Sequence, residues 1–316
     1  MRRFFFGIAI VVLTISYGIP RILRRKYAIH PQGGAILISG ASSGIGRHAA
    51  VSLAQSDASL LVFAGVRRNI DAESILKENL DNLRPILLDV TDVDRIEIAK
   101  ETILAEMRQR EVKDFVGLIN NAGIGKELPL EVQRIESMRK VFDVNVFGVV
   151  SLTQAFVPFL RKSQGRIVNV GSVAGKVVAP MKGTYAASKH ALEALNDAMR
   201  VELGHWGISV SLIQPAYVKT RIAAKQTGKN AVFRSLPTHE RELYAHIFDT
   251  FEARRLRAES RADSPQVTTD AIRHALTSEY PKTRYAVANA HGVPASLFLS
   301  LLPFVPDRLM DRFRGA

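Results

Sequence analysis

Short apolar runs alternate with longer amphipathic stretches from residue 35 onward, and this alternation limits the folds that the chain can adopt. Runs that are apolar along their whole length are typical of a parallel sheet, because helices cover both faces of such a sheet. Seven runs have this composition: Ala35–Ser39, Leu60–Gly65, Pro85–Leu88, Phe115–Ile119, Arg166–Val170, Ser209–Ile213 and Tyr285–Ala288. The pattern predicts a doubly wound α/β domain built on a parallel sheet of about seven strands.

The stretches between these runs have the apolar spacing of helices. The clearest helical patterns are Ile45–Gln55, Val93–Arg108, Arg134–Asn145 and Ala186–Glu202. No long linker or internal repeat interrupts the series, so residues 34–290 are expected to form one domain. Right-handed crossovers would place the functional groups at the carboxyl ends of the strands.

The composition of the 316-residue chain is that of a folded protein, with 47% hydrophobic and 23% charged residues. It matches neither a disordered chain nor a protein that crosses a membrane many times. Because the chain has no cysteine, it lacks disulfides, cysteine-based zinc sites and cysteine nucleophiles, and we expect no metal. We also expect no nucleic-acid partner despite the net charge of +13, since the basic residues are scattered and form no nucleic-acid-binding motif.

The first 28 residues differ from the rest of the chain. An uncharged, mostly apolar run from Phe4 to Pro20 lies between two arginines and a basic cluster at residues 21–26. Its 17 residues are at the short limit for a helix that spans a membrane. We expect an uncleaved single-pass anchor in the endoplasmic reticulum or another intracellular membrane, with the basic cluster against anionic lipid. A cleaved signal peptide and a helix packed on the protein itself are the alternatives.

A glycine-rich segment, SGASSGIG at residues 39–46, joins the first predicted strand directly to a helix. Its glycines permit a tight turn and a close approach of backbone N–H groups to a phosphate, whose charge the helix N-terminus favours. The segment predicts a site for the pyrophosphate of a dinucleotide, with a turn that serves only packing as the alternative. The residues expected to bind are Gly40, Ser42, Ser43, Gly44, Ile45 and Gly46.

The end of the second predicted strand bears on the choice of nucleotide. An acidic residue there would bind the ribose 2′-OH of NAD, whereas an arginine accommodates the 2′-phosphate of NADP. The strand ends in Arg67 and Arg68, so the sequence favours NADP(H), with NAD(H) as the alternative. At the end of the third strand, Asp89 and Val90 are placed to meet the adenine, and Asp89 could equally cap the helix that follows.

An acid/base centre is indicated by three residues in the second half of the chain, Ser172, Tyr185 and Lys189. Tyr185 and Lys189 are four residues apart on a predicted helix, so both side chains project from one face. A nearby ammonium group stabilises phenolate, and Lys189 is therefore expected to lower the pKa of Tyr185 and to make it a general acid/base. Ser172 follows the fifth predicted strand and could hydrogen-bond the oxygen of a carbonyl or alcohol substrate.

Together these motifs resemble those of the short-chain dehydrogenase/reductase family from about Gly34 to the C-terminus. The resemblance rests on SGASSGIG at 39–46, Asn120-Asn121-Ala122-Gly123, Asn145, Ser172 and Tyr185-x3-Lys189. It implies a Rossmann-type fold and hydride transfer between a nicotinamide and a carbonyl or alcohol carbon. Tyr185 would exchange the proton, Lys189 would hold the nicotinamide ribose, and Ser172 would orient the substrate oxygen. Asn145 would hold a water in a proton relay, and Asn121, Ala122 and Gly123 would pack against the cofactor.

The sequence departs from the family pattern at two places. Ser39 stands where threonine is usual, a change that should preserve the hydrogen bond of the hydroxyl. Ala216 stands where the family usually has glycine, in the turn after the sixth strand. The resemblance implies that Pro215, Val218 and Thr220 of this turn still contact the cofactor.

Within the family, the chain resembles the branch that contains 17β-hydroxysteroid, retinol and membrane-associated 3-hydroxybutyrate dehydrogenases. The segments that carry this finer resemblance are Val62–Arg67, Thr283–Val287 and Leu302–Met310. Ser43 together with Arg67 is also similar to the pattern of the NADP-preferring steroid enzymes.

The substrate side of the predicted site is apolar. Val177, Val178 and Met181 lie between Ser172 and Tyr185 in the sequence and are expected to line the pocket with them. Apolar lining favours a lipophilic substrate.

Two further segments would complete the substrate site. Residues 219–265, where family members build a lid, are polar and expected to be partly helical. In the C-terminal extension, residues 291–316, the apolar segment Val293–Val305 is too short to span a bilayer. It would form a mouth that dips into lipid, or else a helix packed on the domain or a dimer interface.

The sequence as a whole predicts an NADP(H)-preferring oxidoreductase of a lipophilic substrate, with a steroid or a retinoid favoured. A 3-keto reductase of fatty-acyl or sphingoid lipids needs the same catalytic groups and is the alternative among enzymes. A non-catalytic nucleotide-binding membrane scaffold is the alternative from another class. The chain could also form a homodimer.

Overall fold

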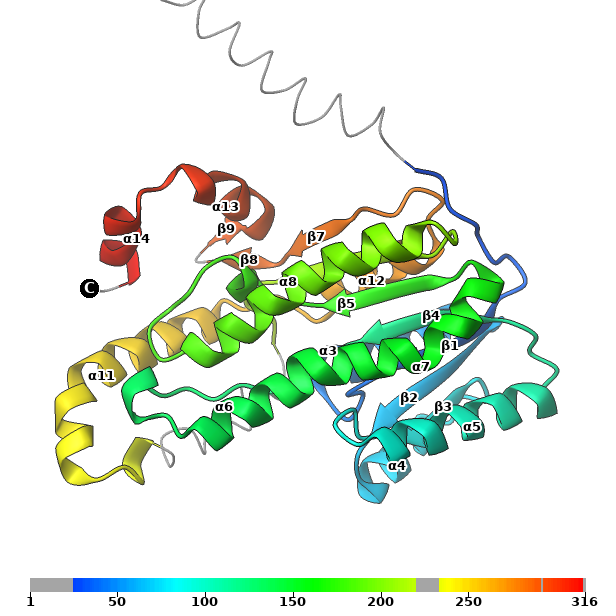
Figure 1. Ribbon diagram of the computed structural model, residues 1–316, viewed down its shortest axis with the longest axis horizontal. Helices are drawn as coiled ribbons and strands as arrows, with labels where there is room; N and C mark the ends of the chain where they lie inside the picture. Colours follow the sequence, from blue (N-terminus) through cyan, green and yellow to red (C-terminus); the bar gives the residue numbers. More distant parts are fainter. Residues whose placement is uncertain (1–24, 220–232, 291, 315–316) are drawn as a thin grey trace, which may run out of the picture.

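The computed structural model describes residues 25–219, 233–290 and 292–314. Thr220 and all but the last four residues of the expected 28-residue anchor segment lie outside these residues, as does part of the expected lid. The described chain is a three-layered α/β domain with additional helices at one end and along one edge (Figure 1).

A seven-stranded sheet with the order β3-β2-β1-β4-β5-β6-β7 forms the centre of this domain. Every neighbouring pair of strands is parallel. The strands are β1 (Gly34–Ile38), β2 (Leu60–Val66), β3 (Leu83–Leu87), β4 (Phe115–Asn120), β5 (Arg166–Val170), β6 (Ser209–Pro215) and β7 (Arg284–Val287). The predicted doubly wound parallel sheet is confirmed. Its strand order reverses between β1 and β4, and in such sheets a ligand binds at that point.

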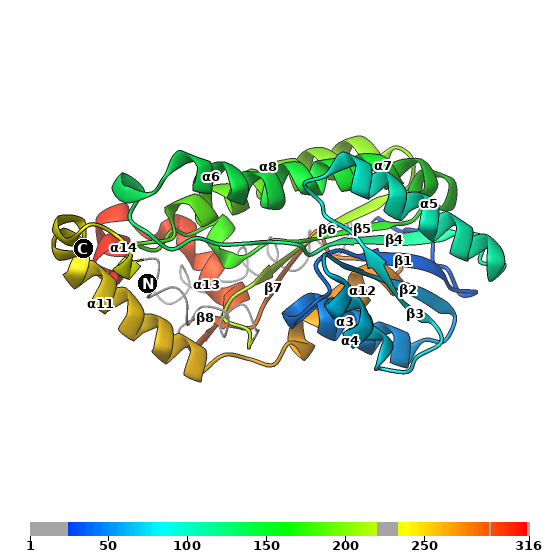
Figure 2. The same ribbon diagram turned by 90° about the horizontal axis from the view of Figure 1, so that it is seen from below.

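Helices cover both faces of the sheet (Figure 2). One layer contains α5 (Val93–Gln109), α7 (Gly148–Ser163) and α8 (Gly183–Gly204), and the other contains α3 (Gly44–Ser56), α4 (Asn69–Leu76) and α12 (Gln266–Thr277). Alternate side chains of a strand point to opposite faces. Leu37 and Phe63 accordingly belong to the core cluster under the first layer, whereas Ile38 and Val62 belong to the cluster under the second.

A continuous helical run in the first layer comprises α6 (Ile135–Phe142), the π turn η3 (Asp143–Phe147) and α7. The predicted helical pattern Arg134–Asn145 covers only the first part of this run, which continues through Pro158 to Ser163. Within the described part of the chain, this run alone is long and apolar enough to cross a membrane. Its Leu152 and Phe156 are fully buried, however, so the run is a core helix of the domain.

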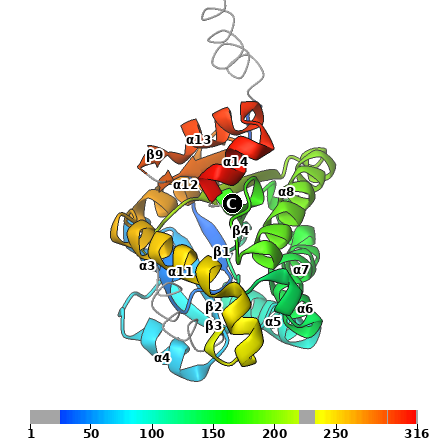
Figure 3. The same ribbon diagram turned by 90° about the vertical axis from the view of Figure 1, so that its left-hand side faces the viewer.

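Helices also lie at the end of the sheet where the strands finish and along the β7 edge. α11 (Thr238–Ser260) crosses in front of the strand ends (Figure 3), in the segment where a partly helical lid was expected. The short strands β8 (Asn289–Ala290) and β9 (Val293–Pro294) follow β7. The C-terminal helices α13 (Ala295–Leu301) and α14 (Asp307–Arg314) then lie beside that strand.

The first described residues are hydrogen-bonded to the end of the domain where the strands begin. Arg25 donates through Nη2 to the carbonyl oxygen of Gly204 at 2.6 Å. The guanidinium of Arg166, at the start of β5, donates to the carbonyl oxygen of Ala28. Because the strands run from this end towards α11, residue 25 and α11 lie at opposite ends of the domain (Figure 1).

Phe156→Ala is expected to lower the free energy of unfolding by about 3–5 kcal/mol. The ring is completely buried and packs against Phe115 of β4 with ring centroids 4.8 Å apart, so truncation leaves a cavity between α7 and the sheet. Denaturant titration measures the change. Val201→Ala, at an exposed position of α8, is the control and should change stability by less than about 0.5 kcal/mol. Equal effects of the two variants would contradict this packing.

Candidate active site

Three elements at the carboxyl end of the sheet carry the four residues expected to be catalytic. Ser172 follows β5 and is the N-cap of the short helix η4 (Val173–Gly175). Tyr185 and Lys189 lie one turn apart on α8. Asn145 lies in the π turn η3, a kind of turn that is frequent at functional sites.

The hydroxyl of Ser39 joins the loop after β1 to the loop after β4. Its Oγ accepts hydrogen bonds from the backbone N–H groups of Asn121 and Ala122, at 3.0 and 3.1 Å. Asn121 in turn donates through Nδ2 to the carbonyl oxygens of Ser39 and Gly40, at 3.0 and 3.1 Å. The hydroxyl thus forms hydrogen bonds in this chain at the position where threonine is usual.

The glycine-rich segment brings the start of α3 close to these two loops. A Cβ atom on Gly46 would lie 2.6 Å from the carbonyl oxygen of Gly40 and still closer to Nδ2 of Asn121, so only glycine fits. Gly40 has a φ of +68°, which an L side chain rarely adopts. Ser43, the N-cap residue, makes no side-chain cap hydrogen bond to α3. The helix N-terminus thus suits the pyrophosphate of a dinucleotide.

The two arginines after β2 differ in their contacts. Arg68 donates through Nε to Asp71 at 2.7 Å, and this pairing raises the pKa of Arg68. Arg67 is exposed and has no hydrogen bond or ion pair with any other described residue. Of the two guanidinium groups, that of Arg67 is therefore the one available for a phosphate.

Asp89 does not cap the helix that follows β3. Its Oδ1 accepts hydrogen bonds from the backbone N–H and the hydroxyl of Thr91, at 3.0 and 2.8 Å. The cap of α5 is Asp92, whose Oδ1 accepts from the backbone N–H of Arg95 at 3.1 Å. Asp89 thus shapes the turn after β3, and Val90 beside it is buried. Their contact with an adenine stays a prediction.

Burial raises the pKa of Tyr185, the nearby hydroxyl of Ser172 acts in the opposite direction, and the nearby carboxylate of Glu127 raises it. The Ser172 hydroxyl itself accepts a hydrogen bond from the backbone N–H of Ala174 at 3.1 Å. The expectation that Lys189 lowers this pKa is wrong for the chain by itself. Burial outweighs the other influences, and the Lys189 ammonium donates instead to the carbonyl oxygen of Val170.

Lys189 is buried and has no carboxylate partner among the residues that the structure describes. Its Nζ lies 2.8 Å from the carbonyl oxygen of Val170 and 5.8 Å from the centre of the Tyr185 ring. Removal from water disfavours the ammonium form and lowers the pKa of Lys189 to about 8. The side chain can therefore exchange a proton near neutral pH.

Asn145 is completely buried and its side chain is engaged on both sides. Oδ1 accepts from the backbone N–H of Ile124 at 2.9 Å. Nδ2 donates to the carbonyl oxygen of Ile124 and to the hydroxyl of Ser188, at 2.9 and 3.0 Å. The amide therefore joins the loop after β4 to α8, on which Tyr185 and Lys189 lie. A hypothetical Cβ on Gly123, in the same loop, would lie 3.5 Å from Oδ1 of Asn145.

Met181 is the predicted pocket residue that the structure places in an apolar cluster. It is 5% exposed and packs in a cluster with Leu128, Phe233 and Phe251, the last of which belongs to α11. Val177 is half-buried and Val178 is 39% exposed, so neither belongs to that cluster. A cavity of about 850 Å³ between β7 and the C-terminal helices contains none of the four expected catalytic residues.

Sequence reasoning missed the residues that come to this cluster from distant segments. Leu128 lies in the loop before α6, and Phe233 and Phe251 come from the region expected to form the lid. Glu127, whose carboxylate lies 3.6 Å from Nζ of Lys182, was missed as well. A single apolar or acidic residue in a loop belongs to no recognisable motif. Only the folded structure, which brings these residues close to Met181 or Tyr185, identifies them.

The turn after β6 is tied to β7 and to the end of α11. The backbone N–H of Ala216 donates to the carbonyl oxygen of Val287 at 3.0 Å. Val218 forms a parallel bridge with Asp263. Pro215 receives a weak hydrogen bond from Ser172 at 3.5 Å through its carbonyl oxygen, so this turn adjoins the expected catalytic residues.

A doubly wound sheet with a glycine-rich loop at its switch point and a tyrosine-lysine pair beside it defines a nicotinamide-dependent oxidoreductase. The family model for short chain dehydrogenases matches residues 34–231. The chain belongs to the short-chain dehydrogenase/reductase family and is an NAD(P)-dependent oxidoreductase. The resemblance of its motifs to this family is thereby confirmed.

Relatives and solved structures match along most of the chain. A 17-beta-hydroxysteroid dehydrogenase type 6 of Bos taurus is 33% identical over 95% of this chain and 94% of its own length. A retinol dehydrogenase 16 of Mus musculus is 30% identical over 96% and 94%. The structure of a short-chain dehydrogenase from Streptomyces avermitilis is 26% identical, with a TM-score of 0.69 over 90% of this chain and 97% of that one. The resemblance to the steroid and retinol branch is confirmed.

Lys189→Met is expected to stabilise the cofactor-free chain by about 2 kcal/mol at pH 7. The substitution removes the free-energy cost of burying the ammonium group, and this gain is larger than the loss of the hydrogen bond to Val170. The folded-state pKa of about 8 lies below the ordinary value of 10.5, so the folded chain binds fewer protons than the unfolded chain between these values. The stability that Lys189→Met gains over the wild type is therefore complete below pH 8 and vanishes as the pH rises towards 10.5.

Denaturant titrations at pH 7 and pH 10 measure this difference. Lys113→Met, at an exposed position, is the control and should show no comparable pH dependence. A loss of stability in Lys189→Met at pH 7 would show that the buried ammonium is not a cost to the fold.

Proposed function

We propose that the protein is an NADP(H)-preferring oxidoreductase of a lipophilic alcohol or ketone, with a steroid or a retinoid as the favoured substrate class. The observation that carries this proposal is the placement of Tyr185 one turn from the buried Lys189 on α8, with the hydroxyl of Ser172 close to that of Tyr185. A bound nicotinamide would supply or accept the hydride. The side chains of the site would move the proton and orient the reacting oxygen.

Tyr185 is the proposed general acid/base. Because burial holds its pKa above the ordinary value, the hydroxyl is protonated near neutral pH and can donate to a carbonyl oxygen. Ser172, whose hydroxyl lies close to that of Tyr185, would donate to the same carbonyl oxygen and hold it in line with Tyr185.

Lys189 and Asn145 are the proposed means of returning the proton to Tyr185. The pKa of about 8 lets Lys189 accept and release a proton under ordinary conditions. Asn145 hydrogen-bonds Ile124 and Ser188 beside it, a rigid arrangement that supports the proposed water relay. The ammonium would also hold the nicotinamide ribose.

The proposed cofactor site extends from the glycine-rich segment to the end of β2. Glycines and backbone N–H groups at residues 40–46 would hold the pyrophosphate, and the free guanidinium of Arg67 would hold the 2′-phosphate of NADP. Arg68 would contribute less, because it is already paired with Asp71. Asp89 and Val90 would lie at the adenine, and residues 121–123, 215, 218 and 220 at the nicotinamide side.

Two observations support a lipophilic substrate. The cluster around Met181 is built from leucine and phenylalanine side chains, which favour an apolar molecule over a sugar or an acid. The relatives named for 17-beta-hydroxysteroid and retinol act on apolar alcohols, which suggests the substrate class for this chain. A membrane anchor before residue 25, an intracellular membrane location and a homodimer stay predictions.

The wild-type protein is expected to consume NADPH with one class of ketone or aldehyde in a panel of steroid ketones, retinal and 3-keto lipids. Tyr185→Phe is expected to lower turnover by about 100-fold or more, because the proton donor is lost. Its dissociation constant for NADPH should change little. Absorbance of NADPH measures turnover, and its fluorescence measures binding.

Tyr217→Phe is the matched control for this variant. It removes the hydroxyl of a half-buried tyrosine in the turn after β6, keeps the ring, and should retain most of the turnover. Full activity of Tyr185→Phe would show that the acid/base assignment is wrong. Turnover with the 3-keto lipids alone would replace the steroid or retinoid substrate by the fatty-acyl or sphingoid one.

Arg67→Asp is expected to weaken NADPH binding by about tenfold or more relative to NADH, because one charge-assisted hydrogen bond to the 2′-phosphate is lost and a repulsive charge is added. The ratio of the two dissociation constants is the measurement. Arg110→Asp, on the exposed end of α5, controls for the change in net charge. An unchanged ratio in Arg67→Asp would contradict the proposed role of this arginine.

A further inference from the structure

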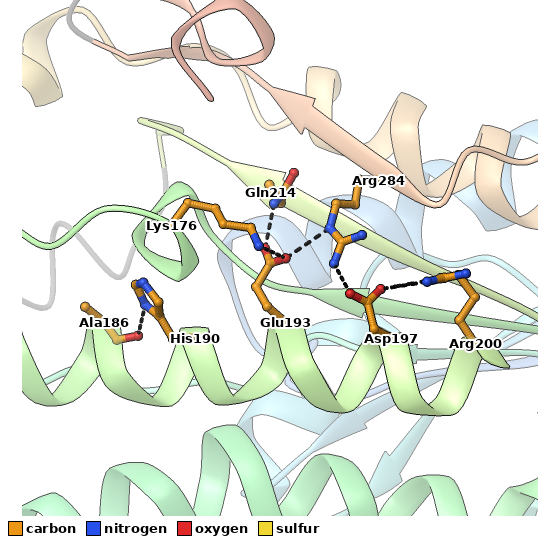
Figure 4. A network of polar contacts seen from close by, with 8 residues as sticks. All are labelled: Lys176, Ala186, His190, Glu193, Asp197, Arg200, Gln214 and Arg284. Atoms are coloured by element: carbon orange, nitrogen blue, oxygen red, sulfur yellow. Dashed lines mark hydrogen bonds and ion pairs between the residues drawn. The ribbon is translucent and has the colours of Figure 1, made fainter. Parts of the chain in front are cut away.

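A buried carboxylate on α8 contacts three segments around the active site. Glu193 is 5% exposed and follows Lys189 by one helical turn. Its Oε1 accepts a hydrogen bond from Nε2 of Gln214 at 2.5 Å. Its Oε2 lies 3.0 Å from Nζ of Lys176 and 3.0 Å from Nε of Arg284 (Figure 4). Both carboxylate oxygens are thus engaged, and two of their partners are cations.

The partners of Glu193 lie next to residues of the proposed active site. Lys176 is the C-cap residue of η4, and Ser172 is the N-cap residue of the same short helix. Gln214 directly precedes Pro215, whose carbonyl oxygen lies 3.5 Å from Oγ of Ser172. A single carboxylate therefore links α8, with Tyr185 and Lys189, to both segments that border Ser172.

The packing around Glu193 leaves little room for these segments to shift. A Cβ atom on Gly175 would lie 3.0 Å from Cγ of Glu193 and 3.0 Å from the carbonyl oxygen of Lys189, so η4 lies directly against α8. On the other side, Gln214 of β6 is paired in register with Ala286 of β7. A displaced carboxylate would move η4 with respect to α8, and Ser172 with respect to Tyr185.

We propose that Glu193 is a positioning residue, which holds η4 and the end of β6 on α8 and thereby sets the hydroxyl of Ser172 against that of Tyr185. A buried ionic group contributes little net stability compared with apolar packing, but its fixed partners can specify one arrangement. This inference rests on the proposed function, because the Ser172–Tyr185 pair matters to turnover only if the two act on the substrate oxygen. Small displacements of such groups lower rates strongly.

Asp197 provides a matched control on the same helix. Its Oδ2 lies 2.6 Å from Nη2 of Arg284, and its Oδ1 lies 3.2 Å from Nη2 of Arg200 (Figure 4). The side chain is 41% exposed and forms no hydrogen bond or ion pair with the described residues of η4 or β6. Asp197→Asn therefore removes a carboxylate from Arg284 without releasing the segments that border Ser172.

Glu193→Gln keeps the size of the side chain and removes its charge. With NADPH and the panel compound that the wild type reduces best, we expect kcat to fall roughly tenfold and the dissociation constant for NADPH to change less than about twofold. Asp197→Asn should change kcat less than about twofold, since its carboxylate pairs with Arg284 and Arg200 and not with the segments that border Ser172. Equal kcat values for the two variants would overturn the assignment.

A double-mutant cycle separates positioning from general stabilisation. If Glu193 acts through Ser172, then Glu193→Gln should have almost no further effect on kcat in the Ser172→Ala protein. The same roughly tenfold loss in that background would overturn the proposal. Thermal unfolding of all four proteins shows whether lost stability accompanies the lost rate.

A second variant covers the case in which Glu193→Gln does not fold. Lys176→Met removes one partner of Glu193 at a side chain that is 42% exposed, and it should lower kcat in the wild-type background but not in Ser172→Ala. An unchanged kcat would overturn the proposal. A wild type that binds NADPH without turning over any compound would refute the proposed function and this inference together, whereas an active wild type with unaffected variants refutes this inference alone.

Discussion

Burial of both faces of the parallel sheet is the constraint on which the rest of the structure depends. Polar side chains inside it must find partners within the protein. Nδ2 of Asn120 donates to Oδ1 of Asn169 at 2.9 Å, and Nδ2 of Asn169 donates to Oδ1 of Asn196 at 3.0 Å, so these amides form a hydrogen-bonded chain across β4, β5 and α8. Reactive groups are therefore confined to the edge where the strands end. The loops after β1, β4, β5 and β6 meet there.

At that edge the chain keeps ionisable groups in places that disfavour their charged forms. Burial lowers the pKa of Lys189 to about 8 and raises that of Tyr185, so the two groups move apart in proton affinity. Tyr185 therefore keeps its proton near neutral pH, as a proton donor must, whereas Lys189 can release its own. Glu193 differs from both, because it is buried with cationic and amide partners. A stable arrangement of the site thus depends on partners that come from η4, β6 and β7.

The sequence predicted the sheet well because hydrophobic patterning reports burial directly. Each predicted strand overlaps an observed one, and the glycine-rich segment lies where a strand enters a helix. A prediction that failed concerns the surroundings of a single side chain. Lys189 was expected to lower the pKa of Tyr185, whereas burial raises it. Such properties depend on burial and on neighbours that the linear sequence does not show.

The sequence by itself determined the order of the strands and helices, the family, and the residues that could take part in hydride transfer, because all of these follow from residue types at fixed spacings. Only the tertiary structure decided which side chains act together. Leu128, Met181 and Phe251 form one apolar cluster although they lie far apart in the chain. Glu193 reaches Lys176, Gln214 and Arg284 because α8, η4, β6 and β7 pack at one place. Contacts of this kind depend on how distant segments of the chain pack together, and no local pattern of residues encodes them.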